Sequence, residues 1–309
     1  MEIFIPDNDH FRFIYDLGLR AAQAGLSILI EGETGTGKMM LADYIHQQTK
    51  PLNHLVTINC GGIHSETLAS YLFGHVEGAY TDARNSRVGK LQLAHKGILF
   101  MDEIGNMPLE IQAKILTAIE TKSFEPLGSN EKISSDFLLI SATNSNLQKE
   151  AEKGNFRVDL LYRIRQVHIH MPTLRDHKDV IPQFAHFFLS ELNAEYGKKV
   201  VLSDEKMREL VERPWYGNVR ELYNELKTYV ALGETGHSVF IPFTSMGVTG
   251  SLNDKLSSVE KEEITKVLQQ TKFNVSKAAL ILNMKRPTLI RRMKELDIRR
   301  DYASSGSKA

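Results

Sequence analysis

Short apolar runs alternate with helical patterns over roughly the first 170 residues of the chain. Runs that predict strands lie at 27–30, 55–58, 98–101, 137–140 and 167–171. Between them the apolar residues recur at helical spacing, most clearly over 109–122. Strands that alternate with helices are typical of a parallel sheet, so we expect an α/β subdomain over residues 1–172.

The pattern changes after Met171-Pro172, where the strand-like runs stop. Helical spacing then continues to residue 232 and predicts helices at 180–196, 204–213 and 219–232. The stretch that follows is rich in Gly, Ser and Thr, the composition of a linker. We therefore expect a helical subdomain at 173–235, a linker at 236–256 and a third, all-helical domain at 257–309.

The first apolar run leads directly into a glycine-rich loop, Gly-Glu-Thr-Gly-Thr-Gly-Lys, at 32–38. Glycine lets the backbone bend, and the bent loop turns successive N–H groups toward an anion at the start of the next helix. Lys38 adds a full positive charge for the outer phosphates. A glycine-rich turn without a ligand is the alternative, but strand, loop and helix are all in place. The loop predicts ATP binding through Gly32, Glu33, Thr34, Gly35, Thr36, Gly37, Lys38 and Met39.

Met39 occupies the position where the full phosphate-loop pattern has a Ser or Thr that helps to hold Mg²⁺. The metal must then be held by water and by another carboxylate. The strand at 98–101 ends in Asp102 and Glu103, at the edge where parallel sheets place their ligands. We expect Asp102 to hold Mg²⁺ and Glu103 to polarise the attacking water. The alternative is a solvated acidic turn, which the phosphate loop upstream makes the weaker interpretation.

A polar residue, Asn144, follows the run at 137–140. At the end of a strand beside the phosphates, an Asn side chain is suited to read the γ-phosphate. The alternative is an ordinary helix-capping Asn.

The composition excludes several classes of protein. We find no run of about 18 apolar residues, so no membrane span is expected. The N-terminus lacks the basic segment of a secretory signal. The single cysteine, Cys60, has no partner for an internal disulfide, and a reducing compartment, the cytoplasm, fits.

The net charge of zero hides an asymmetry between the two parts of the chain. Residues 255–309 contain 13 Lys and Arg against 6 Asp and Glu, a net +7, so the remainder carries −7. An acidic body with a basic tail indicates that only the tail meets nucleic acid.

Within the tail, residues 274–298 show two short helical patterns separated by a turn. Ser276 is the expected N-cap of the first helix, Asn283-Met284 supplies the turn, and Pro287 fits the first turn of the second helix. This order is typical of a helix-turn-helix that reads double-stranded DNA. A basic helical hairpin packed on the rest of the chain is the alternative. The expected DNA contacts are Lys285, Arg286, Thr288, Arg291 and Arg292.

Residues 73–83 read Phe-Gly-His-Val-Glu-Gly-Ala-Tyr-Thr-Asp-Ala and resemble the GAFTGA loop of bacterial enhancer-binding proteins, the AAA+ activators of sigma-54 RNA polymerase. The resemblance covers about residues 10–300 and includes LFMDEIG at 99–105, FRVDLLYRI at 156–164 and WYGNVREL at 215–222. It implies an AAA+ P-loop sheet with a helical lid and a C-terminal Fis-type helix-turn-helix. It also implies a hexamer that contacts the sigma-54 RNA polymerase holoenzyme through Gly78, Ala79, Tyr80, Thr81, Asp82 and Ala83.

The resemblance also implies roles for single residues. Asn59 matches the switch Asn that holds the catalytic Glu103 in an inactive pose. Asn144 matches the residue called sensor I, and Arg220 matches sensor II on the lid.

Arg157 and Arg163 match arginines that are offered to the ATP of a neighbouring subunit, where positive charge stabilises phosphoryl transfer. Four positions depart from the family pattern, the first being Met39, where relatives often carry a Glu. Tyr80 replaces a Phe, Asp82 replaces the second Gly of the loop, and Tyr216 replaces a Pro.

Three functions are compatible with these features. The first is an ATP-hydrolysing activator that binds an upstream DNA sequence and remodels the sigma-54 closed complex. The second is a nucleotide- or ligand-gated DNA-binding regulator that acts with sigma-70 polymerase, an interpretation that Asp82 favours. The third is an ATP-dependent chaperone, against which the helix-turn-helix pattern argues. No sensory domain is recognised ahead of the ATPase, so control is expected from a partner protein, a ligand or the level of expression.

Overall fold

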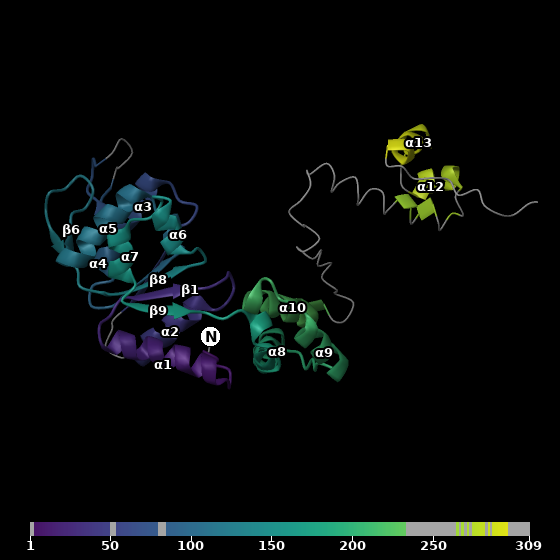
Figure 1. Ribbon diagram of the computed structural model, residues 1–309, viewed down its shortest axis with the longest axis horizontal. Coiled ribbons are helices and arrows are strands. Elements are labelled where there is room, and N and C mark those ends of the chain that lie inside the picture. Colours follow the sequence, from purple (N-terminus) through teal and green to yellow (C-terminus); the bar gives the residue numbers. More distant parts are fainter. Residues whose placement is uncertain are drawn as a thin grey trace, which may run out of the picture. The chain divides into compact units, whose positions relative to one another are not determined.

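The computed structural model describes two compact units, 1–238 and 239–309, which we treat separately (Figure 1). The described residues are 3–49, 54–79, 85–232, 264–265, 267–268, 271, 274–281, 284 and 286–295. The predicted linker and the loop residues Tyr80, Thr81, Asp82 and Ala83 lie outside them, as does Lys285.

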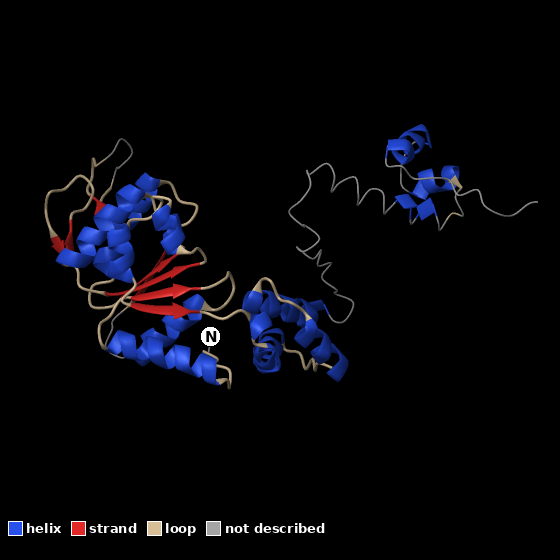
Figure 2. Ribbon diagram, in the orientation of Figure 1, coloured by secondary structure: helices blue, strands red, loops and turns tan. Residues whose placement is uncertain are grey.

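A parallel sheet lies between the helices of the α/β part of the first unit (Figure 2). It has five strands in the order β2-β5-β8-β1-β9. Its strands are β1 (Ile28–Glu31), β2 (Leu55–Asn59), β5 (Ile98–Asp102), β8 (Leu138–Thr143) and β9 (Val167–His170). The predicted α/β class is therefore confirmed. Because all five strands run the same way, their carboxyl ends meet at one edge, where a ligand site is expected.

Helices cover both faces of this sheet (Figure 1). Ile28 and Ile30 of β1 pack on the side of α1 and α2, whereas Leu29 between them packs on the side of α3, α5 and α7. This alternation follows from the two-residue period of a strand. The helices are α1 (Asp9–Gln23), α2 (Lys38–Gln48), α3 (Ser65–Phe73), α4 (Lys90–Leu93), α5 (Leu109–Thr121), α6 (Leu147–Glu152) and α7 (Val158–Ile164).

Two small antiparallel pairs of strands lie on the side of the sheet that α3, α5 and α7 cover. The pair β3 (Gly74–His75) and β4 (Arg87–Val88) closes the base of the loop that carries Gly-Ala-Tyr-Thr-Asp-Ala at 78–83, called here the GAYTDA loop. The second pair is β6 (Ser123–Phe124) with β7 (Ile133–Ser134). The short helix η1 (Ile104–Asn106) directly follows the acidic end of β5.

The helical subdomain, or lid, follows β9 in the same unit. Its elements are η2 (Leu174–Asp176), η3 (Lys178–Val180), α8 (Ile181–Tyr196), α9 (Asp204–Glu212) and α10 (Asn218–Leu232). Trp215 is fully buried, and its indole N–H donates to the Leu210 carbonyl at 2.6 Å. The apolar core of the lid is continuous with that beneath α1 and α2, so the lid is packed onto the sheet domain.

In the second unit, α12 (Val275–Ile281) and α13 (Arg286–Glu295) pack through Ala278, Ala279, Leu289 and Met293. Leu289 and Met293 of α13 are thus buried against α12.

One cap prediction is wrong. The side chain of Asn274 accepts from the backbone N–H of Lys277, and the helix begins at Val275, so Ser276 lies inside the helix and not at its cap. Asn is as good an N-cap as Ser, so the two residues compete and the earlier one starts the helix. None of the helices in the described part of the chain is both long and apolar enough to span a membrane.

Candidate functional site

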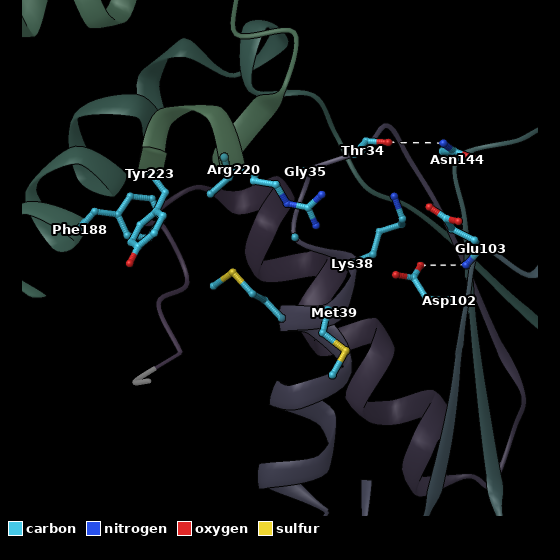
Figure 3. Close-up of a pocket in the computed structure, with 13 residues that line it drawn as sticks. Thr34, Gly35, Lys38, Met39, Asp102, Glu103, Asn144, Phe188, Arg220 and Tyr223 are labelled. Atoms are coloured by element: carbon cyan, nitrogen blue, oxygen red, sulfur yellow. Dashed lines mark hydrogen bonds between the residues drawn. The ribbon is translucent and has the colours of Figure 1, made fainter. Parts of the chain in front are cut away.

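A cavity of about 270 Å³ lies between the carboxyl edge of the sheet and the lid (Figure 3). The phosphate loop contributes Thr34, Gly35, Gly37 and Lys38 to its wall. Gly35 and Gly37 have φ angles of 82° and 94°, in the left-handed region where glycine is favoured. The loop therefore has the backbone conformation that a phosphate cradle requires.

Lys38 begins α2 at the inner end of this loop. Its ammonium group donates to the carbonyl oxygens of Gly32 at 2.8 Å and Glu33 at 2.9 Å. Burial lowers the pKa of Lys38, and the nearby carboxylate of Asp102 opposes that shift. A cation at the start of a helix, facing a carboxylate, is the arrangement expected for a nucleotide phosphate with its metal.

The opposite wall carries the predicted acids, Asp102 and Glu103 (Figure 3). An oxygen of Asp102 accepts from the backbone N–H of Glu103 at 2.9 Å. Glu103 itself has φ 52° and ψ 41°, a left-handed conformation that is rare for residues other than Gly, Asn and Asp. Backbone strain of this kind concentrates at functional sites, where the fold holds a side chain in one required direction.

Two asparagines flank Glu103. The amide of Asn106 donates to Oε2 of Glu103 at 3.4 Å, and Asn59 Oδ1 accepts from the backbone N–H of Gly61 at 2.7 Å. A Cβ on Gly61 would lie 1.9 Å from Glu103 Oε2 and 3.1 Å from Asn59 Oδ1. Asn59 thus lies beside the Glu103 carboxylate, but the hydrogen bond to that carboxylate comes from Asn106, and the switch role of Asn59 stays a prediction.

Asn144 reaches the site from the end of β8. Its amide donates to Oγ1 of Thr34 at 3.4 Å, so the carboxyl end of β8 is joined to the phosphate loop (Figure 3). The structure brings Asn144 to the phosphate loop, and its contact with the γ-phosphate stays a prediction.

The lid closes the cavity with side chains that sequence reasoning did not identify, except for Arg220. Phe188 of α8 and Tyr223 of α10 meet edge to face at 5.3 Å between ring centroids. Together with Val219, Met39 and Met40 they make one end of the cavity apolar, opposite the charged end. In the sequence Phe188, Val219 and Tyr223 look like ordinary core positions of amphipathic helices, and only the fold shows that they line this cavity.

Three residues predicted to bind the nucleotide do not line this cavity: Gly32, Glu33 and Thr36. The Glu33 carboxylate binds the guanidinium of Arg175, and the buried hydroxyl of Thr36 donates to the Glu33 carbonyl. A Cβ on Gly32 would lie 2.9 Å from the Cβ of Met171. These contacts shape the loop from behind, and direct phosphate contacts of the three residues stay predictions.

The two candidate trans-acting arginines lie away from the cavity of their own chain. Arg157 is exposed and forms two hydrogen bonds with Asp159, at 3.0 and 2.7 Å. Arg163 lines a different cavity with Ser27 and Gln166, at the amino ends of the strands. The place of these two arginines in a single chain does not test whether they act on the ATP of a neighbouring subunit, so that role stays a prediction.

The base of the GAYTDA loop is well anchored. His75 is buried, and its two ring nitrogens contact the Ser70 hydroxyl at 2.9 Å and the Asn85 carbonyl at 2.8 Å. Gly78 and Ala79 are the described residues of the GAYTDA motif and form the upper part of its stem. A Cβ on Gly128 would lie 2.7 Å from the Cβ of Ala79. The loop at 126–129 therefore supports the stem of the GAYTDA loop.

In the second unit the predicted DNA contacts Arg286, Thr288, Arg291 and Arg292 all lie on α13. Arg286 is exposed, and Thr288 and Arg292 are half-buried. The helix thus carries the basic residues of a recognition helix together with the apolar positions that pack on α12.

The chain matches three family models along its length. The "Sigma-54 interaction domain" matches residues 4–170, the "AAA+ ATPase lid domain" matches 175–240, and "Bacterial regulatory protein, Fis family" matches 255–296.

Known proteins match over nearly the whole chain. The formate hydrogenlyase transcriptional activator FhlA of Escherichia coli is 38% identical over 288 residues, which cover 90% of this chain and 42% of FhlA. The Nif-specific regulatory protein of Azotobacter vinelandii is 34% identical over 303 residues, covering 93% of this chain and 57% of that protein. The chain therefore spans about half the length of these relatives.

A solved structure of NtrX from Brucella abortus in complex with ATP is similar in fold, with a TM-score of 0.74 and 28% identity. The similarity covers 96% of this chain and 70% of NtrX. The chain therefore belongs to the family of sigma-54-dependent AAA+ transcriptional activators that carry a Fis-type helix-turn-helix.

Proposed function

We propose that this chain hydrolyses ATP and uses the energy to remodel the closed complex of sigma-54 RNA polymerase. The observation that carries the proposal is the meeting of Lys38 with Asp102 and Glu103 in one cavity roofed by the lid. The NtrX structure, which was solved with ATP, supports a nucleotide as the ligand.

In this proposal the charged end of the cavity receives the phosphates and the apolar end receives the base. Lys38 and the loop amides would bind the β- and γ-phosphates, and Asp102 would hold Mg²⁺, which would neutralise phosphate charge. Glu103 orients the attacking water and accepts its proton. Arg220 of the lid adds positive charge from the other side (Figure 3).

The active assembly is proposed to be a hexamer. Arg157 lies outside the cavity of its own chain and is exposed, as a residue that serves a neighbour must be. The GAYTDA loop then delivers the motion to the sigma-54 holoenzyme in the cytoplasm, while α13 holds double-stranded DNA upstream. The controlling signal is proposed to be a partner protein or a ligand.

The hydrolysis step is tested with Glu103→Gln, which keeps the size of the side chain and removes the base. We expect ATP binding to persist and kcat to fall by about 10²–10⁴-fold. Glu120→Gln, an exposed substitution on α5, is the matched control and should leave kcat unchanged. Unchanged turnover in Glu103→Gln would show that another group is the base.

A second candidate is a nucleotide-gated regulator that acts with sigma-70 polymerase, because Asp82 adds a charge to the loop tip. Transcription from a sigma-54-dependent promoter, with purified sigma-54 holoenzyme and ATP, separates the two. Activity that is lost in Thr81→Ala supports remodelling, whereas an inactive wild-type chain that still hydrolyses ATP supports the second candidate.

A further inference from the structure

A buried asparagine joins three segments behind the phosphate loop. Asn218, the first residue of α10, is fully buried and has a φ angle of 53°. Its Oδ1 accepts from the backbone N–H of Leu174, and its amide donates to the Thr34 carbonyl at 3.1 Å and to Glu33 Oε2 at 3.3 Å. One side chain thus connects the lid, the η2 segment that enters it and the phosphate loop.

The carboxylate of Glu33 completes this connection. It binds the Arg175 guanidinium through two hydrogen bonds, of 2.7 and 2.5 Å, and these lower the pKa of Glu33. A bidentate Arg–carboxylate pair constrains orientation as well as distance. The side chain of a phosphate-loop residue is therefore committed to the lid segment and not to the cavity.

The backbones of the loop and the lid also touch. The N–H of Arg220 donates to the Gly35 carbonyl at 3.3 Å. A Cβ on Gly35 would lie 2.1 Å from the carbonyl oxygen of Gly217, so a glycine is needed for the lid to approach this closely. Asn218 lies between these two lid residues in the chain and is itself bonded to the loop at the Thr34 carbonyl.

We infer that Glu33, Arg175 and Asn218 form an interlock that holds the lid on the phosphate loop and positions Arg220 toward the phosphates. They are positioning residues, because they act through Arg220 and not on the nucleotide. A shift of the Thr34 carbonyl when the loop closes on phosphate would be passed through Asn218 to both Leu174 and the lid. This inference rests on the proposed ATP site and adds a route from that site to the lid.

A double-mutant cycle tests the inference. Asn218→Asp keeps the acceptor for Leu174 but removes the amide donors and faces Glu33 with a like charge. We expect kcat for ATP hydrolysis to fall about tenfold in the wild-type background and by less than twofold in an Arg220→Ala background. An equal fold-loss in both backgrounds would overturn the inference, because Asn218 would then act independently of Arg220.

Rescue by a second substitution provides an independent readout. Glu33→Gln restores a donor opposite the carboxylate at position 218 and keeps one acceptor oxygen for Arg175, so the pair of substitutions should recover part of the lost kcat. No recovery overturns the interlock. If Asn218→Asp fails to fold, Arg175→Gln removes the half-buried guanidinium that binds Glu33 and is expected to give the same dependence on Arg220.

Arg20→Gln is the matched control for losing a surface ion pair, because it breaks only the contact with Asp16 on α1. It should leave kcat unchanged. If the wild-type chain binds ATP but does not hydrolyse it, the proposed function is refuted while the interlock is still testable. The affinity of a fluorescent ATP analogue in the same cycle then tests the interlock, and equal losses in both backgrounds would overturn it.

Discussion

Adding one methyl group at Gly35, in Gly35→Ala, is expected to push the lid away from the phosphate loop. Alanine at a φ of 82° costs about 1–2 kcal/mol of backbone strain. The new Cβ would also start 2.1 Å from the Gly217 carbonyl oxygen, whereas ordinary contact begins at 3.4 Å, so the lid must move by roughly 1 Å. Overpacking of this kind costs about 1–3 kcal/mol.

Gly25→Ala is the matched reference. Gly25 has a similar φ of 69°, and nothing lies within 4 Å of its would-be Cβ. It therefore carries the strain without the collision, and we expect a loss of about 1–2 kcal/mol in the free energy of unfolding. For Gly35→Ala we expect about 2–5 kcal/mol, the sum of strain and overpacking.

The assay is thermal unfolding without nucleotide, followed by titration with a fluorescent ATP analogue. For a unit of this size, each kcal/mol lowers Tm by about 2–4 °C. Gly35→Ala should melt clearly below Gly25→Ala and bind the analogue more weakly, while Gly25→Ala binds as the wild type does. Equal melting temperatures for the two variants would refute the reasoning, because the lid would then not rest on Gly35.

Four further outcomes are expected. Trp215→Phe loses the hydrogen bond to Leu210 and should cost about 1–3 kcal/mol, measured by denaturant unfolding. Burial, with the nearby acidic groups, raises the pKa of Cys60 to about 12, so at pH 8 the folded protein should resist a thiol reagent that reacts rapidly after unfolding. Tyr223→Ala removes one wall of the apolar end and should raise KM for ATP more than it lowers kcat, in steady-state assays. Arg291→Ala should weaken DNA binding and reduce the salt slope by about 1, and an unchanged slope would remove it from the phosphate contacts.

Most of the fold and the charged half of the site follow from local sequence patterns. Four strands of the sheet end within one residue of their apolar runs, whereas β8 continues three residues further, to Thr143. Asp102, Glu103 and Asn144 lie at the carboxyl edge because parallel strands share that edge. The helix cap was missed because Asn274 and Ser276 are equally good local candidates. Asn106 could have been noticed, since it follows Glu103 by three residues and a short helical turn brings it back.

The remaining half of the site depends on contacts between residues far apart in the chain. Phe188 and Tyr223 look like core residues, and Glu33 looks like a phosphate-loop contact, until the lid is seen to fold over the loop.

The order of the elements, the phosphate loop and the basic recognition helix were determined by the sequence itself, because periodicity and short motifs are local properties. Only the tertiary structure decided that the lid supplies the apolar end of the cavity and that Glu33 turns to Arg175, 142 residues away. The physical reason is that a side chain takes the partner that the path of the chain brings within reach, and neighbours in sequence do not record that path.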